Sequence, residues 1–210
     1  NILPTGTNFY SIDPYKIPSR ASWKVGIKLA EKLLERYAED EGTLPKNIAM
    51  ILYSGDTIKT NGDDIAEALY LMGVRPVWHN NGDRVIGLEA IPYGELKRPR
   101  IDVTLRISGL FRDTFPTLIK LLEDAMNIVS QLDEDDEINY IKKNLKDDIA
   151  ELLNQGCSLN EAENMAKIRV FGCPPGTYGT GVRTLIESQN WETREDLGRA
   201  YINWSSHAYS

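Results

Sequence analysis

The sequence has few of the residues that build disulfide or metal frameworks. Its 210 residues include two cysteines and two histidines. The cysteines, Cys157 and Cys173, form no CxxC pair, and a disulfide framework would need more of them. A reduced, cytoplasmic setting is therefore expected. The histidines, His79 and His207, lack the spacing of metal ligands, so we expect no transition-metal site built by this chain alone.

Long apolar runs and an excess of basic charge are also lacking. No apolar run approaches the roughly 18 residues that a membrane-spanning helix needs, and no signal peptide is recognisable. The net charge of −7 argues against a general nucleic-acid binder, which would carry a basic stripe. The sequence therefore predicts a chain with no membrane span and no nucleic-acid partner.

Motifs for nucleotide binding and for nucleophilic catalysis are absent too. The stretch at 172–181 (GCPPGTYGTG) lacks the Gly-Lys-Ser/Thr ending of a P-loop, and no G-x-G-x-x-G pattern occurs. The Lys-Thr pair at 59–60 has no leading glycine at the required spacing. No Ser-x-Gly elbow or Cys–His pairing supports a nucleophile. We expect no cofactor bound by this chain itself.

Apolar periodicity in the first half of the chain predicts alternating helices and strands. A helix capped by Ser19 is expected over 20–41, and the apolar run at 48–53 (IAMILY) is typical of a buried parallel strand. The loop at 54–62 precedes a helix that begins at Asp63 and ends at Gly73, and a strand is expected over 74–78. This strand–helix–strand order predicts a right-handed βαβ unit.

The remaining elements become more helical toward the C-terminus. Strands are predicted over 88–91, 100–107 and 168–171, and helices after the N-cap Asp113, over 138–152, after the capping box at 158–161, and over 181–188 and 194–204. The charge run at 133–137 (DEDDE) predicts a solvated linker.

The predicted fold class is α/β, with a mostly parallel sheet, flanking helices and a helix-rich C-terminal part. We expect residues 1–132 to form an α/β lobe and residues 133–210 a helical segment with a Gly/Pro-rich loop, packed on the first lobe. The chain starts at Asn1 and stops at Ser210, which suggests either an excised piece of a longer protein or the product of processing.

Three connections are candidates for a ligand site, because ligands of open α/β sheets bind at the carboxyl ends of strands. They span 54–62, 108–113 and 171–181, and each is expected to leave a strand and enter a helix. Lys59, Arg106 and Arg112 lie in or beside the first two. These connections would suit a ligand that carries carboxylates or phosphates.

Several segments, in order along nearly the whole chain, resemble the large subunit of the tetrapyrrole metal chelatases, the cobaltochelatase and magnesium chelatase family. They are residues 3–10 (LPTGTNFY), 55–60 (GDTIKT), 98–103 (RPRIDV), 108–116 (SGLFRDTFP), 171–181 (FGCPPGTYGTG) and 201–204 (YINW). The proline-proline-glycine stretch and the NFY motif are more similar to the cobalt branch. The resemblance covers only a C-terminal portion of that much longer subunit.

The resemblance implies an ATP-dependent ligase that inserts cobalt or magnesium into a corrin or porphyrin ring, in cobalamin or chlorophyll-type biosynthesis. The metal ion is then a substrate, ATP is used by separate AAA+ ATPase subunits, and the rest of the large subunit is a further partner. The isolated segment is expected to be inactive. The family's His-Gly-x-x-Glu segment is absent from this chain, so the catalytic residues stay unassigned.

The resemblance and the loop positions together suggest five substrate-binding residues: Asp56, Lys59, Arg112, Tyr178 and Gly179. Basic side chains would hold ring carboxylates, Tyr178 would stack on the flat macrocycle, and the glycines would allow close backbone approach. The alternatives are structural. Arg112 would pair with Asp113, Asp56 would cap a helix, and the glycine stretch would be a packed turn. A non-catalytic module that docks the AAA+ subunits is the alternative function.

Overall fold

The computed structural model describes residues 12–209, and the motif at 3–10 lies outside them. A four-stranded sheet runs in the order β1-β4-β5-β6, and a separate two-stranded sheet pairs β2 with β3. The strands are β1 (Asn47–Leu52), β2 (Val74–Trp78), β3 (Val85–Ala90), β4 (Asp102–Ile107), β5 (Val170–Gly172) and β6 (His207–Tyr209). The helices are η2 (Pro14–Lys16), α1 (Arg20–Glu41), α2 (Ser54–Thr60), α3 (Asp63–Met72), α4 (Tyr93–Leu96), α5 (Gly109–Thr114), α6 (Pro116–Ser130), α7 (Tyr140–Asn154), α8 (Leu159–Ala166), α9 (Val182–Glu187) and α10 (Arg194–Trp204).

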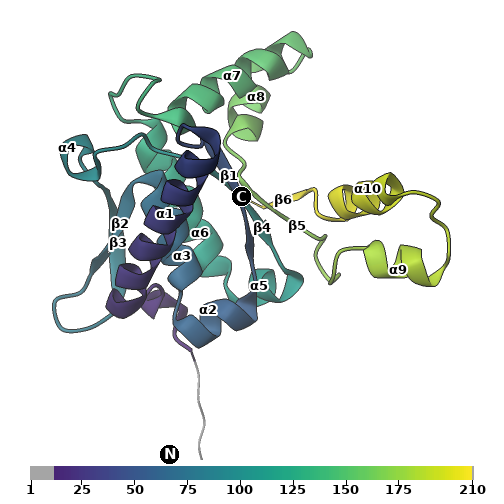
Figure 1. The fold of residues 1–210 in the computed structure, drawn as a ribbon, viewed down its shortest axis with the longest axis horizontal. Coiled ribbons are helices and arrows are strands. Elements are labelled where there is room, and N and C mark those ends of the chain that lie inside the picture. The colour runs from purple at the N-terminus through teal and green to yellow at the C-terminus, as the bar shows by residue number, and fades with distance from the viewer. Residues whose placement is uncertain (1–11, 210) are drawn as a thin grey trace, which may run out of the picture.

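The predicted fold class is confirmed. In the main sheet β1, β4 and β5 are parallel, and β6 closes the edge antiparallel to β5. Figure 1 shows α1, α3 and α6 on one side of this sheet, while α9 and α10 extend away on the other side. The predicted boundary at 132/133 falls between α6 and α7. Because β5 pairs with β4, residues on both sides of that boundary share one sheet, and the division into two lobes stays a prediction.

The prediction that residues 48–78 form a βαβ unit is wrong. The strand at 74–78 forms, but it pairs antiparallel with β3 in the small sheet, and the parallel neighbour of β1 is β4. Short polar turns such as Asn80–Asp83 favour a local hairpin over a crossover. The hairpin packs on α3 and α6, on the side of these helices away from the main sheet.

Local capping explains why most helix ends were predictable. Ser19 accepts a hydrogen bond from the Ser22 amide at the start of α1, and the Ser158–Glu161 capping box starts α8. Asp113 is not the N-cap that the sequence suggested. It lies inside α5, which Ser108 caps, and α6 begins at Pro116 without a side-chain cap.

Helices α1 and α3 touch through small residues. The buried positions of α1 are Ser22, Gly26, Ala30 and Leu34, of which three are small. A Cβ atom built on Gly26 would lie 2.5 Å from the Cβ of Ala66 and 2.6 Å from the backbone nitrogen of Glu67. This glycine therefore sets how closely the two helices approach.

Replacing Gly26 by alanine is expected to destabilise the chain by about 1–3 kcal/mol, because overpacking forces backbone shifts. The intrinsic gain in helix propensity from Gly to Ala, about 1 kcal/mol, offsets only part of this cost. Gly198→Ala in α10 is the matched control, since nothing lies within 4 Å of its added Cβ, and it should be neutral or stabilising. Urea unfolding measures both; equal stabilities would contradict the close approach.

Candidate functional site

The carboxyl ends of β1, β4 and β5 meet at one edge of the main sheet because these strands are parallel neighbours. Helix α2 follows β1, α5 follows β4, and residues 173–181 (the glycine loop) follow β5. We call these three segments the carboxyl edge. Each of the three connections leaves a strand, as predicted, and all three lie at this edge.

The first connection is a helix, which corrects the predicted loop at 54–62. Helix α2 begins directly at Ser54 without a side-chain cap, and Asn61 and Gly62 follow it in left-handed conformation. Asp56 and Lys59 lie on its exposed side. Neither side chain forms a hydrogen bond or an ion pair with another residue in the described range 12–209.

Arg112 of α5 is buried against the glycine loop, with 9% of its surface exposed. Its Nε and Nη2 atoms donate to the two carboxylate oxygens of Asp113, at 2.6 and 2.9 Å. Its Nη1 donates to the carbonyl oxygens of Pro174, at 2.8 Å, and of Cys173 and Thr177, each at 3.3 Å. All three nitrogens are thus engaged within the chain, and Arg112 fixes the shape of the loop.

The Arg112–Asp113 pair also orients Tyr178 in the glycine loop. The Tyr178 hydroxyl donates to Oδ2 of Asp113 at 2.7 Å. The guanidinium carbon of Arg112 lies 5.6 Å from the centre of the Tyr178 ring, within reach of a cation–π interaction. One face of the ring is therefore held by α5, while 61% of the residue remains exposed.

Close backbone approach holds the glycine loop against α5 and β4. A Cβ on Gly109 would lie 2.7 Å from the Thr177 carbonyl oxygen and 2.8 Å from Cδ1 of Tyr178. Arg106 donates from Nη2 to the carbonyl oxygen of Gly179 at 3.0 Å. Gly179 itself has a φ of 81°, a conformation that a residue with a side chain rarely adopts. Hydrogen bonds from Arg106 and Arg112 thus fix the conformation of the glycine loop.

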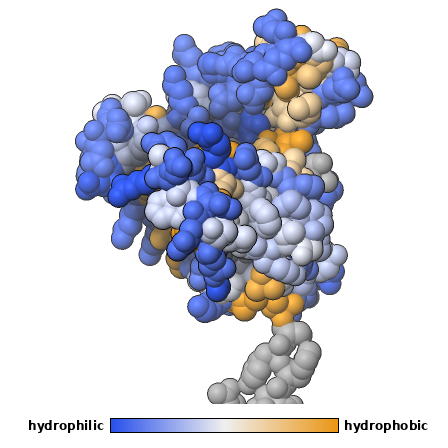
Figure 2. Space-filling model, turned by 90° about the vertical axis from the view of Figure 1, so that its right-hand side faces the viewer, coloured by the Kyte–Doolittle hydropathy of each residue, from blue (hydrophilic) through white to orange (hydrophobic). Residues whose placement is uncertain are grey.

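An exposed apolar row runs along the carboxyl edge. It consists of Tyr53 before α2, Ile58 on α2, Leu110 on α5 and Tyr178, which are between 42% and 61% exposed. Figure 2 shows an apolar patch at the lower end of the molecule, the end at which α2 and α5 lie in Figure 1. Exposed apolar residues gathered at one edge of a sheet indicate a contact surface.

The pKa shifts show what the cluster at Tyr178 can do chemically. The pKa of Asp113 lies below its usual value because Arg112, and then Tyr178, donate hydrogen bonds to it. The pKa of Tyr178 is raised because its hydroxyl donates to that carboxylate. Asp113 therefore stays ionised and Tyr178 stays protonated near neutral pH. The cluster suits orientation and contact better than proton transfer.

Of the five predicted substrate-binding residues, the structure brings Arg112, Tyr178 and Gly179 together in one cluster and places Asp56 and Lys59 on the neighbouring helix α2. Sequence reasoning missed the close approach at Gly109 and the strand β6, whose Tyr209 hydroxyl donates to the carbonyl oxygen of Cys173. The glycine after the capping residue Ser108 was the available signal for the first. A three-residue strand offers almost none.

Comparisons with known proteins agree on one family. The model of the family described as CobN/Magnesium Chelatase matches residues 1–210. The chain is 43% identical to the aerobic cobaltochelatase subunit CobN of Pseudomonas aeruginosa, across all of this chain and 17% of that protein. It is 39% identical to the chloroplastic magnesium-chelatase subunit ChlH of Oryza sativa subsp. japonica, across 99% of this chain and 14% of that protein.

A solved structure shows the same fold. The catalytic subunit of cobaltochelatase from Mycobacterium tuberculosis superimposes with a TM-score of 0.87 at 44% sequence identity. The match covers 96% of this chain and 16% of that one. The chain thus spans about a sixth of the length of the relatives it matches.

Proposed function

Because the chain belongs to the CobN/magnesium chelatase family, we propose that it forms part of the tetrapyrrole-binding large subunit of an ATP-dependent metal chelatase. Cobalt is the metal we favour, since the P. aeruginosa cobaltochelatase subunit is 43% identical and the rice magnesium-chelatase subunit 39% identical. In this proposal the ion is a substrate, and AAA+ partner subunits of a cytoplasmic complex hydrolyse ATP. No described helix is long and apolar enough to cross a membrane.

The observation that carries the proposal is the exposed apolar row beside Lys59, a cation with no side-chain partner among residues 12–209. A flat macrocycle presents an apolar face and peripheral carboxylates. Tyr178 and Leu110 would contact the face, and Lys59 on α2 would pair with a carboxylate. Helix α2 lies against α5, so the two kinds of contact belong to one surface.

In our proposal Arg112 positions the glycine loop and does not contact the ring, since its nitrogens are already engaged with Asp113 and the loop. Gly179 contributes the conformation that brings the loop backbone against Arg106. Asp56, exposed on α2, faces the same edge. Metal insertion also requires a base that removes the pyrrole N–H protons. The protonated Tyr178 and the hydrogen-bonded Asp113 do not suit that role, so the base lies outside this cluster.

Truncating Tyr178 to alanine in the full-length subunit is expected to weaken binding of a metal-free carboxylated tetrapyrrole about fivefold. This corresponds to about 1 kcal/mol of aromatic contact. Lys59→Ala should weaken it by up to about fivefold, the range of an exposed ion pair. Titration followed by the absorbance of the ring measures both.

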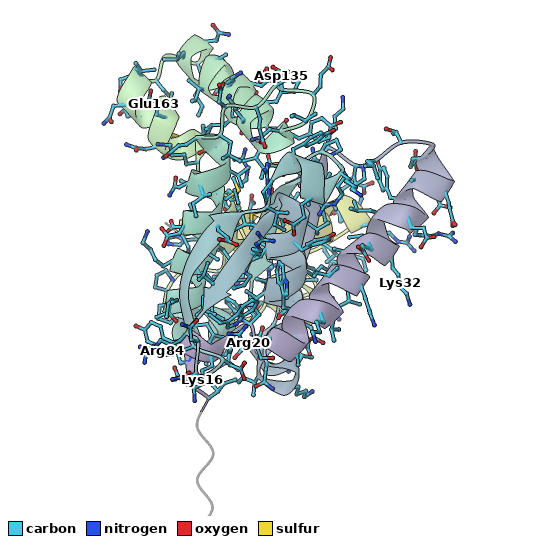
Figure 3. All side chains as sticks on the ribbon, turned by 90° about the vertical axis from the view of Figure 1, so that its left-hand side faces the viewer. Lys16, Arg20, Lys32, Arg84, Asp135 and Glu163 are labelled. Atoms are coloured by element: carbon cyan, nitrogen blue, oxygen red, sulfur yellow. The ribbon has the colours of Figure 1, made fainter. Side chains whose placement is uncertain are left out.

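Two control variants separate contact from general damage. Tyr178→Phe keeps the ring and should bind within about twofold of the parent, because only the hydrogen bond to Asp113 is removed. Lys32→Ala removes an exposed lysine on α1 that points away from the body in Figure 3, and it should change nothing. Unchanged affinity in both Tyr178→Ala and Lys59→Ala would place the ring elsewhere.

The alternative function, a docking module for the AAA+ subunits, has its own supporting observation. Leu153, Leu159 and Met165 are exposed on α7 and α8, which project from the body in Figure 1. Unchanged ring affinity in the carboxyl-edge variants would favour this function.

A further inference from the structure

One face of the main sheet lacks a covering helix at its centre, within residues 12–209. It is formed by Ala49 and Ile51 of β1, Thr104 of β4 and Phe171 of β5. Ala49 pairs in register with Thr104, and Ile51 and Phe171 lie on either side of Arg106. We call these four residues the open face. Ala49 is exposed and Ile51 is 51% exposed, whereas the opposite face packs into the core through Leu52, Leu105 and Val170.

Ala49, Thr104 and Phe171 of the open face form the floor of a hollow of about 480 Å³, and Ile51 continues the same face along β1. Helix α7 forms its wall at one end, through Asn144, Asp147 and Asp148. At the other end Arg106 contacts Tyr201 and Ser205 of the α10 segment. Figure 2, which looks at this side of the molecule, shows apolar atoms just below α7 and α8.

The lining of the hollow is acidic. Asp102, Asp147 and Asp148 line it against the guanidinium of Arg169. Arg169 is shared between Asp102, at 3.0 Å, and Asp148, at 2.8 Å. Asp147 pairs with Lys143 on the exposed side of α7. Three carboxylates against two cations, Arg169 and Lys143, leave this wall with a net negative charge.

Parallel sheets are normally covered by helices on both faces, because their strands are apolar on both sides. Here α3 and α6 cover one face. Three strands about 4.8 Å apart make a floor about 10 Å across, the width of one helix. We propose that an amphipathic helix from the rest of the same large-subunit polypeptide lies on the open face, with apolar residues on the floor and lysine or arginine toward the Asp147–Asp148 wall.

Two observations favour the same polypeptide as the occupant. The matched segment is 17% of the P. aeruginosa subunit, so most of such a subunit is available to cover this face. The hollow also lies on one face of the main sheet, the place where a layered α/β domain normally packs a helix of the same chain. This inference does not depend on where the ring binds.

Cysteine labelling of the full-length subunit tests the proposal. Ile51→Cys probes the open face, and Ile86→Cys on β3, a site 59% exposed, is the matched reference. In the isolated, dilute subunit we expect a maleimide to label the cysteine at position 51 at least tenfold more slowly than that at position 86, read by mass spectrometry of the labelled peptides. Ala49→Cys repeats the measurement with a smaller change, in case Ile51→Cys folds poorly.

Charge reversal tests the basic side of the helix. Asp147→Lys is expected to raise the labelling rate at position 51 about fivefold, because it repels the proposed cations. Glu163→Lys on α8, which Figure 3 shows apart from the main sheet, should leave that rate unchanged. Equal effects of Asp147→Lys and Glu163→Lys on this rate would contradict the proposed contact between the acidic wall and basic residues of the helix.

Three outcomes would overturn the proposal. Equal labelling rates at positions 51 and 86 in the lone subunit would mean that nothing covers the face. Protection that appears only when the ATPase subunits are added would assign the face to them. Protection that grows with subunit concentration would assign it to a second copy.

Discussion

Replacing Arg112 by methionine is expected to destabilise the chain by about 3 kcal/mol and to weaken tetrapyrrole binding by the full-length subunit. The change leaves the Asp113 carboxylate with the Tyr178 hydroxyl but without its charged partner, and it removes the guanidinium donor from the carbonyls of Cys173, Pro174 and Thr177. The glycine loop then loses the conformation that presents Tyr178. Urea unfolding and a ring titration measure the two effects.

Arg183→Met is the control for the Arg112 result, because Arg183 makes an exposed i,i+4 pair with Glu187 and should cost less than about 0.5 kcal/mol. Arg112→Lys keeps the charge but loses the planar fork of the guanidinium. Its free energy of unfolding should therefore lie between those of Arg112→Met and the parent. If Arg112→Met lost ring affinity at full stability, Arg112 would bind the ring directly, as the sequence interpretation suggested.

Arg100→Met is expected to cost about 3–5 kcal/mol, the range for breaking a buried ion pair. Arg100 is 1% exposed, and its Nε and Nη2 atoms donate to Glu134 at 2.7 and 2.8 Å. It also donates to the carbonyl oxygens of Gly73, at 2.6 Å, and Ile91, at 2.8 Å. One side chain thus connects α3, the β2–β3 hairpin and the segment before α7.

Arg75, which is partly exposed, provides the comparison for Arg100. It pairs with Glu89 of the hairpin and Glu95 of α4, both more than half exposed, so Arg75→Met should cost about 1 kcal/mol or less. Urea unfolding of the two variants should differ by at least about 2 kcal/mol. A smaller difference would mean that Arg100 is not the connection described.

Local patterns predicted the elements whose ends are marked by side chains close in sequence. Ser19, Gly73 and the Ser158–Glu161 box bound α1, α3 and α8 as expected, because caps and left-handed glycines act within one turn. The edge on which the candidate site lies was predictable for a related reason. Parallel strands followed by helices place their connections at one end of the sheet.

Features that depend on distant partners were not predictable. Strand β2 has the same apolar pattern in a crossover as in a hairpin, so its pairing with β3 required the tertiary structure. The charge run at 133–137 was interpreted as a solvated linker, yet Glu134 turns inward to the buried Arg100. The sequence interpretation kept both a ligand and Asp113 as partners of Arg112, and only the folded loop shows its three carbonyl contacts.

The pairing of β5 with β6 has a consequence for how this region can vary. Val170 lies opposite Tyr209, and Gly172 lies opposite His207. The segment that contains the glycine loop, α9 and α10 therefore leaves the sheet after β5 and returns to it at β6. Because these two strands are paired, the two ends of the segment are held side by side. Lengthening or exchanging the outer part of this segment, between α9 and α10, leaves both anchoring strands in place. The surface displayed there is free to diverge between relatives without disturbing the core or the position of α5.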